Sequence, residues 1–141
     1  MKLVRRFSRR AAILVCLLVL WATTFANPAS ADEYFSVKEY NEFHHVLHPL
    51  QHEALPAKDF QRIRTTAAEL VKRGKAIVQV GLPSGTPAKH HEEFRKELKK
   101  FDGALESFSR HAQDGTDAQL ENSFSAVHDS FEMLVGMLPR K

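Results

Sequence analysis

The chain has very little cysteine, and this shortage excludes several kinds of chemistry. Its one cysteine, Cys16, lies in an apolar segment near the N-terminus that we expect to be removed with a signal peptide. The mature chain would then have no disulfide, no thiolate metal ligand and no thiol nucleophile. A small exported domain without disulfides depends on the packing of its core, which favours an idealised helical bundle.

Residues 1–31 have the three parts of a secretory signal peptide. Five basic residues come before an apolar segment, 11–21, that is too short to span a bilayer comfortably. Ala29 and Ala31 then place small residues at positions −3 and −1 of a cleavage site before Asp32. We therefore expect general secretion to the periplasm or the exterior. No stable membrane anchor would remain after cleavage, and residues 32–141 would form the mature domain.

The mature chain also lacks an excess of basic charge. The whole sequence has 20 Lys and Arg against 17 Asp and Glu, but five of the basic residues lie in the expected signal peptide. Removing them leaves 15 basic and 17 acidic residues, a net charge of −2. No basic stripe remains that would favour nucleic acid as a partner. The remaining residues are enough for one domain with its own core.

Motifs of the common enzyme classes are missing as well. The sequence has no Gly-rich phosphate loop, no G-x-S-x-G nucleophile elbow and no H-E-x-x-H zinc-protease motif. Glu42 and His45 form one Glu-x-x-His motif, but di-iron bundles use two. We therefore expect a protein that is not an enzyme.

What the mature chain does contain is four stretches with apolar residues at helical spacing. We expect helices at about 36–54, 58–80, 87–113 and 116–138. Gly- and Pro-containing breakers separate them, and no run alternates with the period of a strand. Four amphipathic helices with short connections predict an all-α, up-down-up-down antiparallel four-helix bundle.

The first of these helices contains a proline, which makes its length a specific question. Its apolar stripe runs straight through Pro49 to Ala54. Proline normally ends or kinks a helix, but a helix that ended at His48 would leave half the length of its partners uncovered. We therefore expect a helix that is kinked at Pro49 and continues to about Ala54.

Histidine is abundant in the mature chain, and half of its histidines lie in this first helix. At about 100° per residue, His44, His45, His48 and His52 would share an arc of about 100° on one flank. His44 lies nearest to the core, whereas His45 and His52 point mostly outward. Imidazoles four residues apart present their nitrogens on one face, and they suit zinc, copper, nickel and iron.

His128 repeats this placement on the fourth helix. If the first helix continues through Pro49, His44 and His128 lie at the same distance from one end of the bundle. We therefore expect His44, His48 and His128 to converge on one copper or zinc ion, with His52 and His45 as further ligands. The candidate outer ligands are Glu53, His111 and Glu132.

Each of these histidines also has a plainer interpretation, as part of a solvated helix face. Such a face could instead contact a periplasmic protein or a second copy of the chain in a pH-dependent way, because imidazole titrates near neutrality.

We expect His90 and His91 to be an exposed pair at the opposite end of the bundle. Met133 and Met137 are expected to fill gaps in the core.

A local resemblance concerns the fourth helix. The segment Phe124–Glu132, F-S-A-V-H-D-S-F-E, resembles the haem-attachment stretch of cytochrome c-prime. Exported four-helix bundles of this size are similar to that family and to the soluble periplasmic b-type cytochromes. The resemblance puts His128 at the position of the haem-ligating histidine. Phe124 and Val127 occupy the two cysteine positions, so covalent haem is excluded.

These patterns leave two classes of function open. The first is a non-catalytic protein that binds copper or zinc for storage, delivery or sensing. The second is a helical interaction domain with a pH-sensitive histidine face, or a cytochrome-like bundle that has lost its haem. The many large phenylalanines predict a filled core, which argues against non-covalent haem.

Overall fold

The computed structural model describes residues 34–140, so the expected signal peptide and its cleavage site lie outside the described residues. Within this range every regular element is a helix, and the expectation of an all-α domain with four helices is confirmed. None of these helices is long and apolar enough to cross a membrane. The elements are α1 (Lys38–Pro49), the π-helical turn η1 (Leu50–Ala54), α2 (Phe60–Val80), the 3₁₀ turn η2 (Ala88–His90), α3 (His91–Asp114) and α4 (Asp117–Val135).

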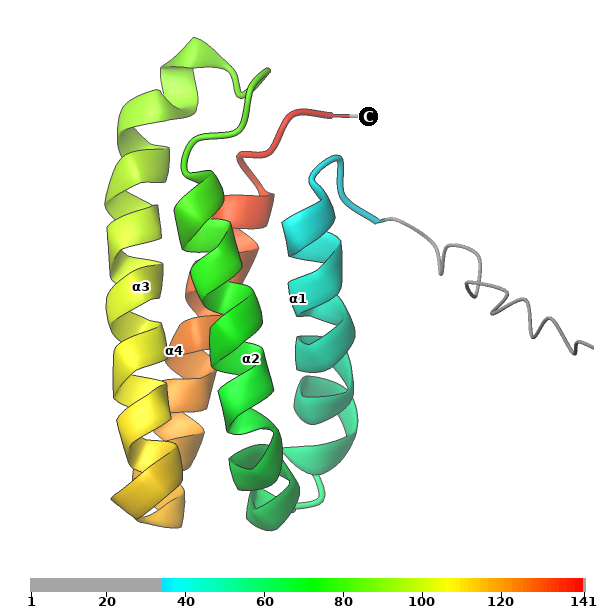
Figure 1. Ribbon diagram of the computed structural model, residues 1–141, viewed down its shortest axis with the longest axis vertical. Coiled ribbons are helices and arrows are strands. Elements are labelled where there is room, and N and C mark those ends of the chain that lie inside the picture. The colour runs from blue at the N-terminus through cyan, green and yellow to red at the C-terminus, as the bar shows by residue number, and fades with distance from the viewer. Residues whose placement is uncertain (1–33, 141) are drawn as a thin grey trace, which may run out of the picture.

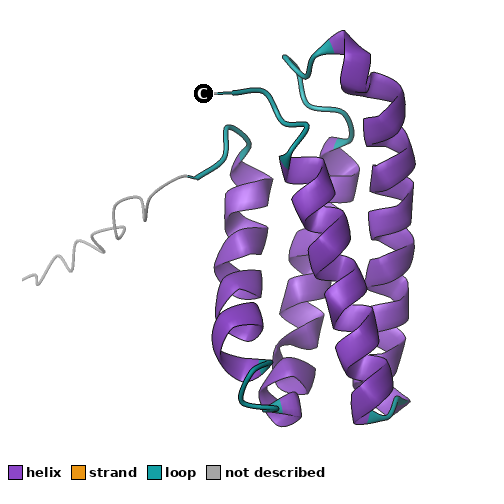
Figure 2. Ribbon diagram, turned by 180° about the vertical axis from the view of Figure 1, so that it is seen from behind, coloured by secondary structure: helices purple, strands orange, loops and turns teal. Residues whose placement is uncertain are grey.

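The four helices lie side by side along the long axis of the molecule (Figure 1). Helices that follow one another in the chain are also neighbours in space: α1 packs on α2, α2 on α3, and α3 on α4. The turn after η1 and the α3–α4 connection lie at one end (Figure 2). The α2–α3 loop and the C-terminal segment lie at the other end.

Pro49 does not end the first helix. α1 includes Pro49 and passes directly into η1, where the Leu55 N–H donates to the Leu50 carbonyl oxygen at 2.9 Å. Proline has no N–H, so the carbonyl of His45 loses its usual partner four residues later. The chain then continues with the wider i to i+5 hydrogen bonds of a π-helix. The expectation that this helix continues to Ala54 is confirmed, and its last turn is π rather than α.

Local chemistry sets the other helix ends. Lys58 adopts a left-handed conformation with φ of 54°, so α2 begins two residues later than expected, with Asp59 as its N-cap. Thr116 and Gln119 form a capping box at the start of α4. α4 ends at Val135 instead of Leu138.

The expected apolar stripes meet in one core. Seven aromatic side chains fill much of it, each fully buried: Tyr40, Phe43, Phe94, Phe101, Phe108, Phe124 and Phe131. Gly74 on α2 lets α3 come close, because a Cβ atom there would lie 2.6 Å from both Cδ atoms of Leu105. This confirms the interpretation of Gly74 as a point of close helix approach. Met137 belongs to this core, but Met133 is half exposed and does not fill a core gap as expected.

Candidate metal-binding site

Three imidazoles lie in a line along α1 and η1, and we refer to His44, His48 and His52 as the histidine row. The ring centroids of His44 and His48 are 5.2 Å apart, and those of His48 and His52 are 4.4 Å apart. His44 is half-buried, whereas His48 and His52 are exposed. The row therefore has one end against the protein and the other end open to solvent.

The π-helical turn keeps His52 close to His48 on the same side of the helix. In a regular α-helix each four-residue step turns a side chain by about 40° around the axis, so a series of such steps drifts away from one face. The wider turn over Leu50–Ala54 reduces this drift, and His52 lies closer to His48 than His44 does. Single π turns inside helices are frequent at functional sites.

Aromatic rings hold His44 in place. Its ring meets Tyr34 edge-on at 5.3 Å and Phe35 edge-on at 5.5 Å, and it stacks on Phe131 at 6.3 Å, all between centroids. The sequence indicated the flank position of His44 but not these neighbours. Tyr34 and Phe35 precede the first helix, where no periodic pattern indicates which way a side chain turns.

Burial lowers the pKa of His44 below its ordinary value of 6.5. The neighbouring His48 lowers this pKa further, while the carboxylate of Glu132 on α4 opposes the shift. His45 and His52 add smaller effects in the lowering direction. At neutral pH His44 is therefore uncharged, and a neutral imidazole is the form that binds a metal ion.

A few contacts fix the register between the first helix and α4. Near the start of α1, Ser36 Oγ donates a 2.8 Å hydrogen bond to the carbonyl oxygen of Pro139. Further along, the ring centroids of Phe43 and Phe131 lie 4.8 Å apart. Residue numbers therefore rise along α1 as they fall along the facing part of α4.

This register places His128 away from the level that the sequence predicted. It lies three residues before Phe131, which places it opposite residues 46–47 of α1, between His44 and His48 and nearer to His48. Its Nδ1 atom is 3.3 Å from Asp129 Oδ1. Across residues 34–140, no three His, Cys, Asp or Glu side chains are arranged to hold a metal ion. Convergence of His44, His48 and His128 on one ion therefore stays a prediction.

The remaining candidate ligands are dispersed. His45 is exposed beside the row, and Glu53 is paired with Arg62 at 2.9 Å. Glu132 is exposed on α4, on the side that faces His44. His111, near the end of α3, has a buried Nδ1 atom with no hydrogen-bond partner among the described residues, and no ring contact links it to the row.

His90 and His91 are not the exposed pair that the sequence suggested. Both side chains are half-buried at the start of α3. His91 Nε2 donates a 2.8 Å hydrogen bond to the Thr86 carbonyl oxygen, which ties this helix to the preceding loop. The loop folds back over the helix start, and the helical pattern gave no sign of it.

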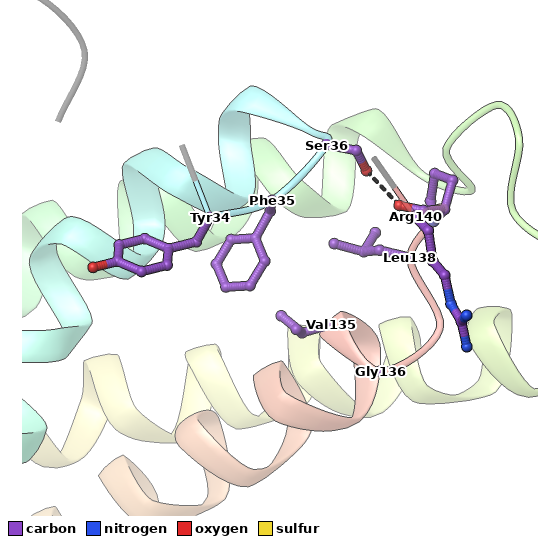
Figure 3. Close-up of a pocket in the computed structure, with 8 residues that line it drawn as sticks. Tyr34, Phe35, Ser36, Val135, Gly136, Leu138 and Arg140 are labelled. Atoms are coloured by element: carbon purple, nitrogen blue, oxygen red, sulfur yellow. Dashed lines mark hydrogen bonds between the residues drawn. The ribbon is translucent and has the colours of Figure 1, made fainter. Parts of the chain in front are cut away.

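A separate hollow of about 310 Å³ lies between the start of the described chain and its C-terminal segment (Figure 3). It is lined by Tyr34, Phe35, Ser36, Val135, Gly136, Leu138, Pro139 and Arg140. Its walls are both polar and apolar, and Ser36 already bonds to Pro139. Its lining includes no His, Cys, Asp or Glu that could hold a metal ion, and Tyr34 is its one acidic side chain.

No protein-family model, curated protein or solved structure matches the chain. The histidine row is accordingly interpreted from its own geometry.

Proposed function

We propose that the chain is an exported, non-catalytic, up-down-up-down antiparallel four-helix bundle that binds copper or zinc for storage, delivery or sensing. The observation that carries the proposal is the histidine row, in which three imidazoles follow one another at 5.2 and 4.4 Å between centroids. Zinc and copper are metals that imidazole nitrogen ligates well.

The proposed bundle topology is supported by its connections. They lie at alternate ends of the molecule (Figure 2). At one end Ser36 bonds to Pro139, and at the other Lys58 pairs with Glu121 at 2.7 Å. Short connections of this kind are typical of antiparallel neighbours in a bundle.

The proposed ligands differ in how easily an ion can reach them. His48 and His52 are adjacent and exposed, so an ion can reach them without any change in the core. His44 extends the row on its protected side. His45 and His128 are further ligands in this proposal. Glu132, Glu53 and His111 are the candidate outer ligands.

The resemblance of Phe124–Glu132 to cytochrome c-prime supports the bundle architecture but not a haem protein. Phe124 and Val127 stand where a covalently bound haem needs cysteines. Both side chains are fully buried in a core that is filled by aromatic rings. A haem would have to displace several of these rings.

Metal titration tests the proposal. The chain is expressed with its own N-terminal segment, purified without a histidine tag, stripped with a chelator and titrated with Zn²⁺ and Cu²⁺ by calorimetry. We expect saturable binding, and we expect His48→Ala to weaken it more than tenfold, about 1.4 kcal/mol. His90→Ala is the matched control and should bind like the unchanged protein. Absence of saturable binding, or equal binding by both variants, would refute the proposal.

A second candidate is an interaction domain whose histidine face responds to pH. The observation that favours it is the lowered pKa of His44, whose ring packs on Phe131 of another helix. Protonation would place a charge in this half-buried contact. If the titration shows no metal binding, a change in near-UV circular dichroism between pH 7 and 5 would support this alternative.

A further inference from the structure

The histidine row is incomplete as a zinc site within one chain. Structural zinc sites in proteins almost always have four tetrahedral ligands. His48 and His52 supply two adjacent imidazoles, but the described residues contain no group of three ligand side chains placed around one point. Two further ligands must come from water or from another molecule.

Two nearby groups in the same chain, His44 and Glu53, are already engaged. Tyr34, Phe35 and Phe131 hold the ring of His44 against the protein. Glu53, next to His52 in sequence, is paired with Arg62 at 2.9 Å.

The exposed end of the row is open to a second copy of the chain. α1 lies at one edge of the molecule (Figure 1), and His48 on α1 and His52 on η1 are both exposed. A two-fold axis beside this edge would bring the same pair from a second copy opposite the first. In such an isologous contact both copies contribute the same residues, so two histidines from each copy give four ligands.

We propose that one zinc ion joins two copies of this chain through His48 and His52 of each. The inference rests on the proposed metal-binding function and adds the partner that completes the site. Four neutral imidazoles leave the double positive charge of zinc unbalanced. Glu53 is adjacent to His52 in each copy, but its ion pair with Arg62 at 2.9 Å offsets its charge, so the site keeps a net positive charge. The metal-free protein is then a monomer, and zinc binding and dimerisation are the same event.

Mass and stoichiometry together test this inference. The tag-free chain, expressed with its own N-terminal segment, is stripped of metal and examined by light scattering and analytical ultracentrifugation at increasing ZnSO₄. We expect the mass to double at saturation, with half a zinc per chain by elemental analysis. His48→Ala and His52→Ala should each remain monomeric in zinc. His90→Ala should dimerise like the unchanged protein, and circular dichroism should show all variants equally helical.

Each other outcome has a definite meaning. One zinc per chain in a monomer would overturn the shared site and leave the proposed metal binding intact. No zinc binding at all would overturn the shared zinc site, and absence of copper binding as well would overturn the proposed metal binding. A dimer that forms without zinc, or a zinc-dependent dimer that survives both substitutions, would show that His48 and His52 do not bridge the copies.

Discussion

His44 illustrates how far one residue can be understood from its position in the sequence. Helical spacing placed it on the flank of the first helix, and the structure finds it half-buried there. Its lowered pKa could not have been derived in this way. Its main cause is burial of the ring, which packs against Tyr34 and Phe35 before the helix and against Phe131 far away in the chain, and the neighbouring His48 adds to it.

The lowered pKa of His44 predicts a pH dependence of stability in the metal-free protein. The folded pKa lies below the unfolded value of about 6.5, so the unfolded chain takes up the proton more readily. Stability is therefore complete above pH 6.5 and declines as the pH falls through the folded pKa. We expect His44→Gln, which has no titrating ring, to show a smaller fall in Tm between pH 7 and 5. Thermal unfolding followed by circular dichroism, in the presence of a chelator, measures this.

His90→Gln is the matched control for this prediction and should follow the unchanged protein. His48, His45 and His52 enter this prediction only through their effect on the pKa of His44. If the curves of His44→Gln and the unchanged protein run parallel from pH 7 to 5, the assignment of this effect to His44 is wrong.

At the scale of an element, hydrophobic periodicity proved sufficient to predict the helices but not their fine structure. The stripe that includes Leu47, Leu50 and Ala54 indicated that the first helix passes Pro49, and all three are buried. The π turn was not predictable, because it depends on how the backbone rearranges its hydrogen bonds after a proline. The positive φ of Lys58, after which α2 begins two residues later than expected, could not be predicted from periodicity either.

The contact between α2 and α3 at Gly74 predicts a pair of opposite effects. Alanine at Gly74 would gain about 1 kcal/mol of helix propensity. Its Cβ would lie 2.6 Å from two atoms of the fully buried Leu105, and such overpacking costs about 1–3 kcal/mol. We therefore expect Gly74→Ala to destabilise the protein by up to about 2 kcal/mol, as measured by urea unfolding.

Gly103 on α3 provides the control, because nothing lies within 4 Å of a Cβ placed there. Gly103→Ala should gain the propensity without the clash and raise stability by about 1 kcal/mol. Stabilisation of similar size by both substitutions would mean that α3 can move away from Gly74 at no cost.

The capping box at the start of α4 predicts a second local effect. Thr116 Oγ1 accepts the Gln119 N–H at 3.2 Å, and the Gln119 side chain accepts the Thr116 N–H at 2.9 Å. Thr116→Ala should cost about 1 kcal/mol in urea unfolding. The same substitution at Thr65, exposed in the middle of α2, should cost nothing. A loss of similar size at Thr65 would contradict the role of the cap.

At the scale of the whole molecule, the sequence could not give the register between the first and last helices. Counting residues from one end placed His128 level with His44. The structure instead sets Phe131 beside Phe43 and His44, which moves His128 toward the level of His48. Such a register depends on how large side chains interlock between elements that are distant in the chain. The fold and the four candidate histidines of the first helix were therefore predictable, but the way in which the fourth helix contributes was not.

This difference in register predicts which histidine matters more for metal binding. If the row is the site, His52→Ala should lower zinc affinity more than tenfold, about 1.4 kcal/mol, because it removes the imidazole 4.4 Å from His48. His128→Ala should have a much smaller effect, because its Nδ1 lies 3.3 Å from Asp129 Oδ1 and it is not part of the row. Binding to the unchanged protein should weaken as the pH falls through about 6, since a protonated imidazole cannot bind a metal ion. Calorimetric titration of the tag-free variants at pH 7.5 and pH 5.5 compares them directly.

The reverse ranking, with His128→Ala the more damaging, would favour the three-histidine site of His44, His48 and His128.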